Sequence, residues 1–529
     1  MRNFDLPGRS PVIAENGMAA TSHPLATATA LSVLRDGGNA VDAAIAASAV
    51  LAVVEPHMTG IGGDCFVILA EPDGSVHGLN GSGRSAARAQ PGWYRERGFS
   101  KVPSHGPHTI TVPGAIKAWE ALAHRFGTRG FDALFTDAIR YAEEGFAIHP
   151  RVAWDWQRHV GDLAADEGGR RHYLVDGQAP AMLSRLKLPA LGHTLRRIAR
   201  EGSRAFYEGD IAAEIARTVQ TKGGFLDEAD LAAVTADWVG TITTEYRGHT
   251  IHEIPPSGQG VTALIILNLM TALGVDRLAP GSAERHHLMI EAARLAYAVR
   301  DREVGDPSFM AGTVGQFLSP ALTETLAGSF DPHRRNEALS LPPLPNADTV
   351  YLTVVDRDRR AVSFINSLYS GFGSRVVTPE SGIALQNRGA CFSVVEGHPN
   401  EIGPSKRPMH TIIPGMAMRD GRPSISFGVM GGAYQPMGHA LVLSNMLDHD
   451  MDPQMAIDWP RLFWGDDEQV LEAETGISQA VRSELAAKGH KVVDAQAPLG
   501  GSQIIAIDHA SGFLIGGSDP RKDGCALGW

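Results

Sequence analysis

Residues 348–356 read Asp-Thr-Val-Tyr-Leu-Thr-Val-Val-Asp, and residues 361–368 read Ala-Val-Ser-Phe-Ile-Asn-Ser-Leu. Both runs are rich in the β-branched and aromatic residues that favour strands, and the residues between them favour a turn. The pattern predicts a β-hairpin centred on Asp358. In that register Thr349 faces Ser367, and directly opposed residues have Cβ atoms about 4.5–5.5 Å apart. Two hydroxyl side chains are therefore expected to meet at the open end of the hairpin.

A proline-rich linker precedes this hairpin. Residues 331–348 include Pro342-Pro343-Leu344-Pro345, and proline prevents regular backbone pairing, so the linker is expected to be extended and exposed. Helical patterns dominate from about 130 to 330, with a β-like interruption near 240–254, whereas strand patterns dominate after the linker. The change predicts the main boundary of the chain at 348/349, between residues 1–348 and residues 349–529.

The rest of the chain predicts a mixture of helices and hairpins. Helices are expected over residues 26–36, 41–54 and 115–126, because these stretches are Ala-rich or amphipathic and contain no proline. Hairpins are expected over residues 65–79, around Arg419-Asp420-Gly421 and around residues 508–512. Helices in the first part and strands in the second indicate an α+β protein.

The threonine that opens the hairpin has one route to becoming a nucleophile. A threonine hydroxyl reacts poorly at neutral pH unless a base takes its proton. If Thr349 were the first residue of a chain, its own α-amine, with a pKa of about 7.7–8.0, would supply that base. This route requires cleavage of the bond between Asp348 and Thr349, which the linker would leave accessible. From the pattern alone, an ordinary Thr–Ser cross-strand pair remains the alternative.

Composition excludes several other classes of protein. The net charge of −12 argues against nucleic-acid binding, which needs clustered Lys and Arg. The three widely separated cysteines form no disulfide framework, and we expect neither a signal peptide nor a membrane-spanning segment. The chain is therefore expected to be cytoplasmic, with no membrane or nucleic-acid partner.

Motifs for other catalytic mechanisms are missing. His252-Glu253 lacks the second histidine of a zinc-protease helix, and no Gly-x-Ser-x-Gly segment occurs. Cys65 is expected to be a buried structural residue. We therefore expect no metal and no organic cofactor.

Ten segments together resemble the γ-glutamyltransferase family, and they occur in that family's order from about residue 10 to the C-terminus. The first is Asp348 to Asp356, which resembles the family's processing site. The others are Gly37-Gly38-Asn39-Ala40-Val41-Asp42-Ala43-Ala44, Gly62-Gly63, Val112-Pro113-Gly114, Pro256-Ser257-Gly258-Gln259-Gly260, Glu291-Ala292-Ala293-Arg294-Leu295-Ala296-Tyr297, Gly305-Asp306-Pro307, Glu380-Ser381-Gly382-Ile383, Lys406-Arg407-Pro408 and Gly431-Gly432.

The resemblance implies a fold and a set of catalytic roles. The family has the four-layer αββα sandwich of N-terminal-nucleophile hydrolases, here built jointly by a large subunit, 1–348, and a small subunit, 349–529, from one precursor. Thr349 matches the nucleophile, and Ser367 matches a hydroxyl that hydrogen-bonds it. Gly431 and Gly432 match paired glycines whose N–H groups form an oxyanion hole. A homodimer of the processed pair is also compatible with the family.

At the substrate end the chain departs from the family. Tyr369 stands where transpeptidases have an asparagine, and Cys391 stands where they have the aspartate that holds the substrate's α-ammonium group. Arg388 precedes Cys391 by three residues. This exchange removes an anion and adds a cation, and a guanidinium suits a carboxylate. A solvated surface charge is the alternative for Arg388.

Three more residues correspond to family positions that bind substrate. His410 and Thr411 stand in place of the family's paired serines, and Arg84 lies nearest to its substrate-carboxylate arginine. The six residues from Arg84 to Thr411 are thus expected to line the substrate site.

We therefore expect a self-processing amidohydrolase acting on a small amide that carries a carboxylate but no α-amino group, such as an oxamate-like or glutaryl-like compound. A γ-glutamyl transpeptidase or glutathione hydrolase is one alternative. An uncleaved, non-catalytic binding protein on the same scaffold is another.

Overall fold

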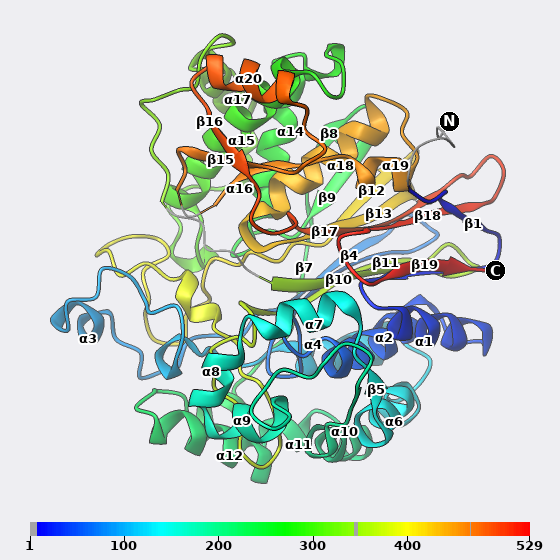
Figure 1. Ribbon diagram of the computed structural model, residues 1–529, viewed down its shortest axis with the longest axis vertical. Helices are drawn as coiled ribbons and strands as arrows, with labels where there is room; N and C mark the ends of the chain where they lie inside the picture. The colour runs from blue at the N-terminus through cyan, green and yellow to red at the C-terminus, as the bar shows by residue number, and fades with distance from the viewer. Residues whose placement is uncertain (1–7, 343–347, 466) are drawn as a thin grey trace.

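Two sheets and two helical layers make up the protein. The structure is a computed structural model that describes residues 8–342, 348–465 and 467–529. Two seven-stranded antiparallel sheets lie face to face, and helices cover the outer face of each (Figure 1). The layers thus follow the order helix, sheet, sheet, helix, which confirms the predicted α+β class and the four-layer αββα sandwich.

The first sheet has the strand order β1-β18-β17-β13-β12-β9-β8. Its strands are β1 (Val12–Ala14), β18 (Leu514–Ser518), β17 (Gly501–Ile507), β13 (Arg422–Met430), β12 (Gly415–Arg419), β9 (His249–Glu253) and β8 (Ile242–Tyr246).

The second sheet has the order β19-β2-β10-β11-β3-β4-β7. Its strands are β19 (Cys525–Gly528), β2 (Met18–Thr21), β10 (Asp348–Val355), β11 (Ala361–Tyr369), β3 (Asp64–Ala70), β4 (Val76–Gly81) and β7 (Asp237–Val239). Each sheet contains strands from before and after Thr349, so residues 1–348 and 349–529 build one sandwich jointly.

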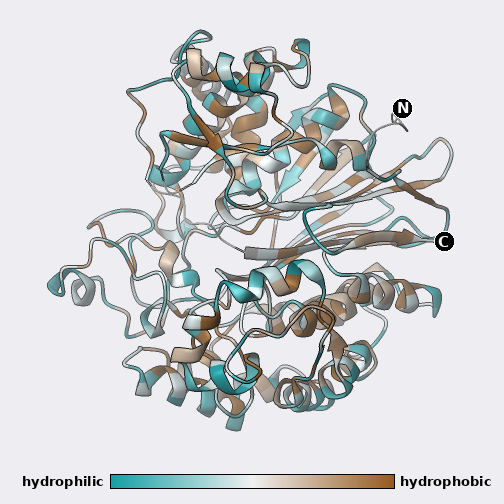
Figure 2. Cartoon of the chain, in the orientation of Figure 1, coloured by the Kyte–Doolittle hydropathy of each residue, from teal (hydrophilic) through white to brown (hydrophobic). Residues whose placement is uncertain are grey.

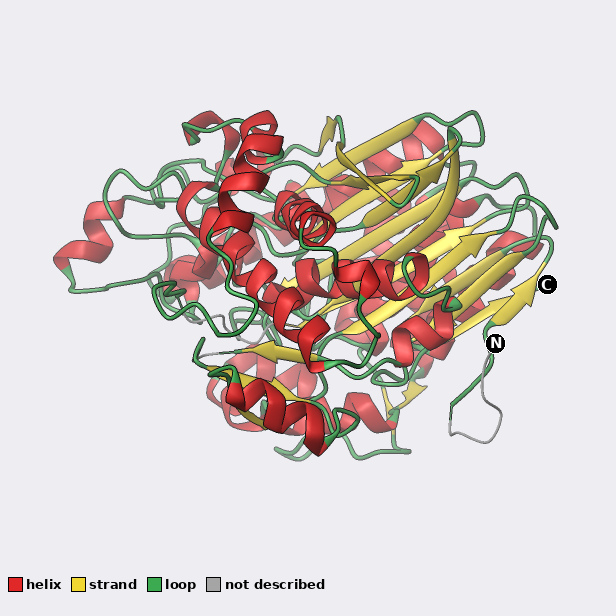
Figure 3. Cartoon of the chain, turned by 90° about the horizontal axis from the view of Figure 1, so that it is seen from above, coloured by secondary structure: helices red, strands yellow, loops and turns green. Residues whose placement is uncertain are grey.

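Helices of the outer layers lie across the strands (Figure 3). The first sheet is covered by α14 (Gly260–Ala272), α15 (Ala283–Glu303), α18 (Gln435–Leu447) and α19 (Pro453–Asp458), with α16 (Val314–Phe317), α17 (Pro320–Gly328), α20 (Gln479–Ala487) and a small sheet of β14 (Leu462–Trp464), β15 (Val470–Ala473) and β16 (Lys491–Asp494) beyond them.

The second sheet is covered by a larger helical layer. Its helices are α1 (Pro24–Arg35), α2 (Ala40–Val54), α4 (Ala115–Phe126), α5 (Phe131–Leu134), α6 (Thr136–Glu144), α7 (Pro150–Gln157), α8 (Val160–Ala165), α9 (Glu167–Tyr173), α10 (Pro189–Glu201), α11 (Arg204–Tyr207), α12 (Asp210–Thr221) and α13 (Glu228–Ala232). A two-stranded sheet of β5 (Phe146–Ala147) and β6 (Arg185–Leu186) belongs to this layer, and α3 (Pro91–Glu96) lies to one side.

The helix α2 shows how sequence sets this packing. Asn39 caps its first turn by accepting the N–H groups of Val41 and Asp42, and the Asp42 carboxylate accepts the Asn39 N–H in return. All of its residues are buried, which explains why the helix has no polar face. It therefore forms a rigid support under the second sheet, which carries Thr349.

Apolar side chains fill three layers of core, and Figure 2 colours the strands and helices that contribute them by the hydropathy of each residue. One cluster lies between the second sheet and its helices, a second lies between the first sheet and its helices, and a third separates the two sheets. Val350, Leu352 and Val354 belong to the first cluster, whereas Tyr351 and Val355 belong to the inter-sheet cluster. This alternation follows the two-residue period of a strand.

Most of the predicted elements are present. The helices expected over 26–36, 41–54 and 115–126 correspond to α1, α2 and α4, and the three additional hairpins correspond to β3–β4, β12–β13 and β17–β18. In the described part of the chain, no helix is both long and apolar enough to cross a membrane.

The linker agrees with its prediction over most of the part that the structure describes. Residues 343–347 lie outside the described residues, and residues 331–342 form no helix or strand and are exposed or partly exposed except for Leu341, which is buried in the core. Side chains of neighbouring elements also bind the linker's backbone, as detailed below.

Candidate active site

Thr349 and Ser367 meet at the end of the β10–β11 hairpin. The strands pair from Val350↔Asn366 to Val355↔Ala361, with an irregularity between Asp348 and Val350. The Oγ1 of Thr349 lies 3.3 Å from the Oγ of Ser367, and both residues are fully buried. The hairpin register and the approach of the two hydroxyls are as the sequence predicts.

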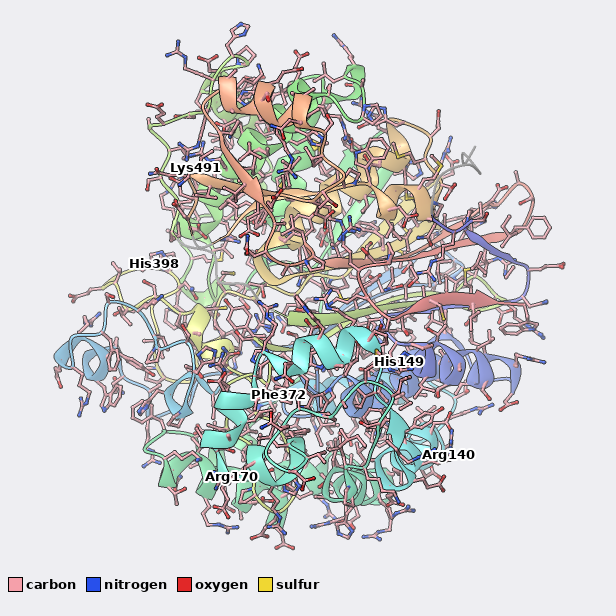
Figure 4. The ribbon with its side chains drawn as sticks, viewed as in Figure 1. Arg140, His149, Arg170, Phe372, His398 and Lys491 are labelled. Atoms are coloured by element: carbon pink, nitrogen blue, oxygen red, sulfur yellow. The ribbon has the colours of Figure 1, made fainter. Side chains whose placement is uncertain are left out.

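The end of β11 is fixed by contacts to the helical layer. Tyr369 has a φ of 84°, which is unusual for a residue with a side chain, and its N–H donates to the Ser367 Oγ over 2.8 Å. Phe372, labelled in Figure 4, packs its ring against Trp156 of α7 and Tyr173 of α9. These contacts hold Ser367 beside Thr349.

Arg388 lies beyond Tyr369, in the short 3-10 helix Arg388–Cys391. It is 0% exposed, so its alternative interpretation as a solvated surface charge is wrong. Its Nη1 donates to the Thr411 Oγ1 over 2.7 Å and lies 3.9 Å from the Cys391 Sγ, and its guanidinium lies 4.3 Å from the centre of the Tyr369 ring. Four of the predicted substrate residues are therefore in one place.

Part of this guanidinium has no partner among the residues that the structure describes. Among the described residues, no hydrogen-bond acceptor reaches the Nε or Nη2 of Arg388. A buried donor without a partner is costly, by roughly 1–3 kcal/mol for a neutral group and more for a charged one. The arrangement suits a ligand that brings an anion. Burial, together with the neighbouring Cys391, raises the pKa of Tyr369 well above its usual value, so its phenol stays neutral and offers no negative charge.

Gly431 and Gly432 join β13 to α18 through the 3-10 helix Gly432–Tyr434. Their φ values of 115° and 55° are positive, and a Cβ on Gly431 would lie 2.9 Å from the Gly500 Cα. Residues with side chains rarely adopt such conformations. The N–H groups at a helix start have no partner within the helix, and the dipole of α18 adds positive potential there.

Gln259 links the glycine pair to Thr411. Its Nε2 donates to the carbonyl oxygens of Gly432 and Thr411 over 3.0 Å and 2.6 Å, and its Oε1 accepts from Arg300. Gln259 belongs to the family-like segment Pro256 to Gly260, and the sequence alone predicts no role for it. Its function depends on a fold that brings residues 259, 411 and 432 together, and no local pattern predicts that.

His410 does not have the direct role that the resemblance implied. Its Nε2 lies 2.9 Å from the Asp64 Oδ2, and its Nδ1 accepts the Ile412 N–H, so both ring nitrogens have partners inside the protein. Burial, with Arg388 as the next cause, lowers the pKa of His410 to about 4. Asp64 also pairs with Ser367 across β3 and β11, so His410 supports, through Asp64, the strand that carries Ser367.

Asp64 is a second residue that sequence reasoning missed. Its Oδ1 accepts from the N–H groups of Gly83 and Gly114 and from the Gln386 side chain, and it is fully buried. The only local signal is its position directly after Gly62-Gly63.

Arg84 makes different contacts from the Arg388 group. Its side chain is 41% exposed, and its Nη1 contacts the Asp306 carboxylate and the Ser405 carbonyl oxygen. It lines a small pocket with Asp230 and Arg407. Among the described residues, none of the hydrogen bonds or ion pairs of Arg84 therefore involves another of the predicted substrate residues.

Known proteins resemble this chain over nearly its whole length. The "Glutathione hydrolase-like YwrD proenzyme" of Bacillus subtilis (strain 168) is 36% identical over 98% of this chain and 99% of its own. The "Oxamate amidohydrolase proenzyme" of Klebsiella pneumoniae is 35% identical over 98% of this chain and 99% of its own. The crystal structure of a cephalosporin acylase from Bacillus halodurans matches this fold with a TM-score of 0.92 over 100% of this chain and 99% of that one. The two sequences are 37% identical.

A family profile agrees with these relatives. The profile described as Gamma-glutamyltranspeptidase matches residues 26–529, which include every residue of the site described above. The chain therefore belongs to the γ-glutamyltranspeptidase family.

Proposed function

We propose that this chain cuts itself before Thr349 and then hydrolyses the amide bond of a small carboxylate-bearing amide. The observation that carries the substrate class is the buried Arg388, whose Nε and Nη2 have no acceptor among the described residues. The contact between Thr349 and Ser367 supports the nucleophile.

Self-cleavage is an acyl shift followed by hydrolysis. The Thr349 Oγ1 attacks the carbonyl carbon of Asp348, the peptide C–N bond breaks, and the hydroxyl proton passes to the Thr349 nitrogen, which becomes an amine. Water then hydrolyses the resulting ester. The products are a large subunit that ends in the Asp348 carboxylate and a small subunit that begins with Thr349.

Amide hydrolysis reuses the same atoms. The Thr349 Oγ1 attacks the substrate carbonyl carbon, and the new α-amine accepts the hydroxyl proton. The N–H groups of Gly431 and Gly432 stabilise the negative oxygen of the tetrahedral intermediate. The C–N bond breaks, the amine passes its proton to the leaving nitrogen, and ammonia or an amine departs. Water hydrolyses the threonyl ester and releases the acid.

Arg388 selects the substrate by charge. A carboxylate can accept two parallel hydrogen bonds from a guanidinium. Contacts run from Arg388 to Tyr369 and on to Ser367, and from Arg388 to Thr411 and through Gln259 to Gly432. The carboxylate site thus adjoins both the nucleophile and the glycine pair, which favours a short spacing between carboxylate and amide.

The relatives support an amidohydrolase and leave two substrate classes to compare. The name oxamate amidohydrolase agrees with an amide that lacks an α-amino group, whereas the name glutathione hydrolase-like favours a γ-glutamyl compound, and the name cephalosporin acylase agrees with either class. An α-ammonium group would lie beside the Arg388 cation, so we favour the first class.

The test compares kcat/KM for oxamate, a glutaryl anilide and a γ-glutamyl anilide in the wild type, Arg388→Met and Arg84→Met. The carboxylate amides should exceed the γ-glutamyl anilide. Arg388→Met should lower their kcat/KM by roughly 10- to 150-fold, the equivalent of about 1.5–3 kcal/mol for a charged hydrogen bond. Arg84→Met should have a small effect. Superiority of the γ-glutamyl anilide in the wild type would overturn the substrate class.

A further inference from the structure

One face of α15 binds the linker that leads to Thr349. Glu291 and Arg294 lie three residues apart on this helix, both are buried, and Arg294 Nη1 contacts the Glu291 Oε1 over 2.8 Å. They belong to a segment that the sequence analysis singled out, and neither the nucleophile nor the substrate site uses them.

Glu291 and Arg294 bind the backbone of the linker. Arg294 donates from Nη1 to the Asn336 carbonyl oxygen over 3.0 Å and from Nη2 to the Leu339 carbonyl oxygen over 2.8 Å. The Glu291 Oε2 accepts the Asn336 N–H over 2.9 Å. Because every contact is to the main chain, the pair fixes the path of the linker whatever side chains it carries.

Glu468, from the part of the chain after Thr349, adds to these contacts. The Glu468 carboxylate, which follows Thr349 in sequence, accepts from Arg294 over 3.0 Å and from Arg335 of the linker over 2.7 Å. Leu341 then enters the core next to α15. Residues 335–341 are therefore held between groups from both of the proposed subunits.

These contacts to the linker matter for self-cleavage because they restrain the chain that leads to the bond to be cut. Intramolecular attack requires the reacting atoms to be held about 3–3.5 Å apart and aligned, and a displacement of about 1 Å can cost 10²-fold in rate. Thr349 is fixed by the hairpin. The carbonyl that it attacks belongs to the chain arriving from the linker, and the buried pair fixes where that chain starts.

We propose that Glu291 and Arg294 are positioning residues for self-cleavage and not for amide hydrolysis. The inference rests on the proposed self-cleavage at Thr349. It predicts that loss of the pair slows maturation, whereas each mature site that does form turns over normally.

The alternative is that substitutions here merely distort α15. Further along the same helix, the Tyr297 hydroxyl donates to the Ala433 carbonyl oxygen, and Arg300 donates to Gln259, which holds Gly432. Distortion of α15 would thus lower turnover by the mature site as well. Turnover per mature site separates the two explanations.

The experiment follows the conversion of newly made precursor by denaturing electrophoresis and mass spectrometry in Arg294→Met and Glu291→Gln. Arg285→Met is the matched control, because Arg285 is a buried arginine of the same helix that contacts Pro280, Ser444 and Asn445. Conversion should slow about tenfold or more in the first two variants and stay near the wild-type rate in the control. The kcat and KM, expressed per small subunit that begins with Thr349, should match the wild type.

Wild-type conversion rates in both variants, or an equal fall in turnover per mature site, would overturn the inference. Arg335→Met provides a second variant if the buried substitutions fail to fold, since Arg335 belongs to the linker and its loss leaves Glu291 and Arg294 intact; it should also slow conversion. A wild type that is never cut would instead refute the proposed function itself.

Discussion

The Thr349 Oγ1 lies 3.3 Å from the Ser367 Oγ, which also accepts the Tyr369 N–H. Ser367 therefore orients the proposed nucleophile, and Ser367→Ala should slow both self-cleavage and turnover. A hydrogen bond contributes about 0.5–1.5 kcal/mol, so the expected loss is roughly two- to twelve-fold. Ser367→Thr keeps a hydroxyl and should retain most of the activity.

Ser363→Ala is the matched control for this prediction. Ser363 lies on the same strand, is equally buried and bonds Tyr351 and Gly415, away from Thr349. The Ser363→Ala variant should have a lower free energy of unfolding but should cut itself at the wild-type rate. Equal effects of the two alanine variants on cleavage would contradict the special role of Ser367.

The glycine pair gives a second prediction. Gly431→Val or Gly432→Val should lower kcat by about 10²-fold or more, because removing one oxyanion donor costs roughly 2.7–4 kcal/mol. Gly421→Val is the control, since Gly421 has a φ of 73° at the far end of β13 with open space around it. It bears the same conformational cost without touching the site. Normal kcat in both valine variants would assign the pair to an ordinary turn.

Sequence predicted the parts of the site that are local. The register of β10 and β11 follows from one turn and a two-residue alternation, so the meeting of Thr349 and Ser367 was accessible without a structure. The grouping of Arg388 with Thr411 came from the family resemblance.

The remaining parts depend on contacts between distant segments. Gln259 donates to Thr411 and Gly432, Asp64 contacts the His410 ring, and Arg294 donates to the linker backbone. Each of these contacts joins residues far apart in sequence, and neither periodicity nor turn chemistry predicts such contacts. The burial of Leu341 and the contacts to the linker's backbone were missed for the same reason, because proline content shows where regular pairing stops but not what binds the backbone.

Cys391 offers a chemical probe of the proposed carboxylate site. Its Sγ lies 3.9 Å from the Arg388 Nη1, so iodoacetate should alkylate it faster than neutral iodoacetamide, by roughly tenfold or about 1.4 kcal/mol. Arg388→Met is the control, because Cys525 has the Arg9 guanidinium nearby and so has a neighbouring cation of its own. Peptide mass spectrometry measures the rates of both reagents at Cys391. The preference should vanish in Arg388→Met, and a preference that persists in that variant would argue against an anion site at Arg388.

His410 predicts a pH dependence of stability. Its pKa of about 4 in the folded protein is below the ordinary value of 6.5, so between these values the unfolded state binds more protons. The resulting stability is complete above pH 6.5 and is lost as the pH falls toward 4, on the order of 3 kcal/mol in total. Thermal unfolding midpoints of uncut Thr349→Ala chains at pH 7.5 and 5 measure it. Adding His410→Gln should shrink the difference, and an unchanged difference would contradict the assignment.

The masses of the chains in the purified protein show whether it cuts itself before Thr349. The account predicts two chains, residues 1–348 and 349–529, with Thr349 as the N-terminus of the smaller one, and a single uncut, inactive chain for Thr349→Ala. A wild type that hydrolyses amides as one intact chain, or a Thr349→Ala variant that still splits at this bond, would contradict it.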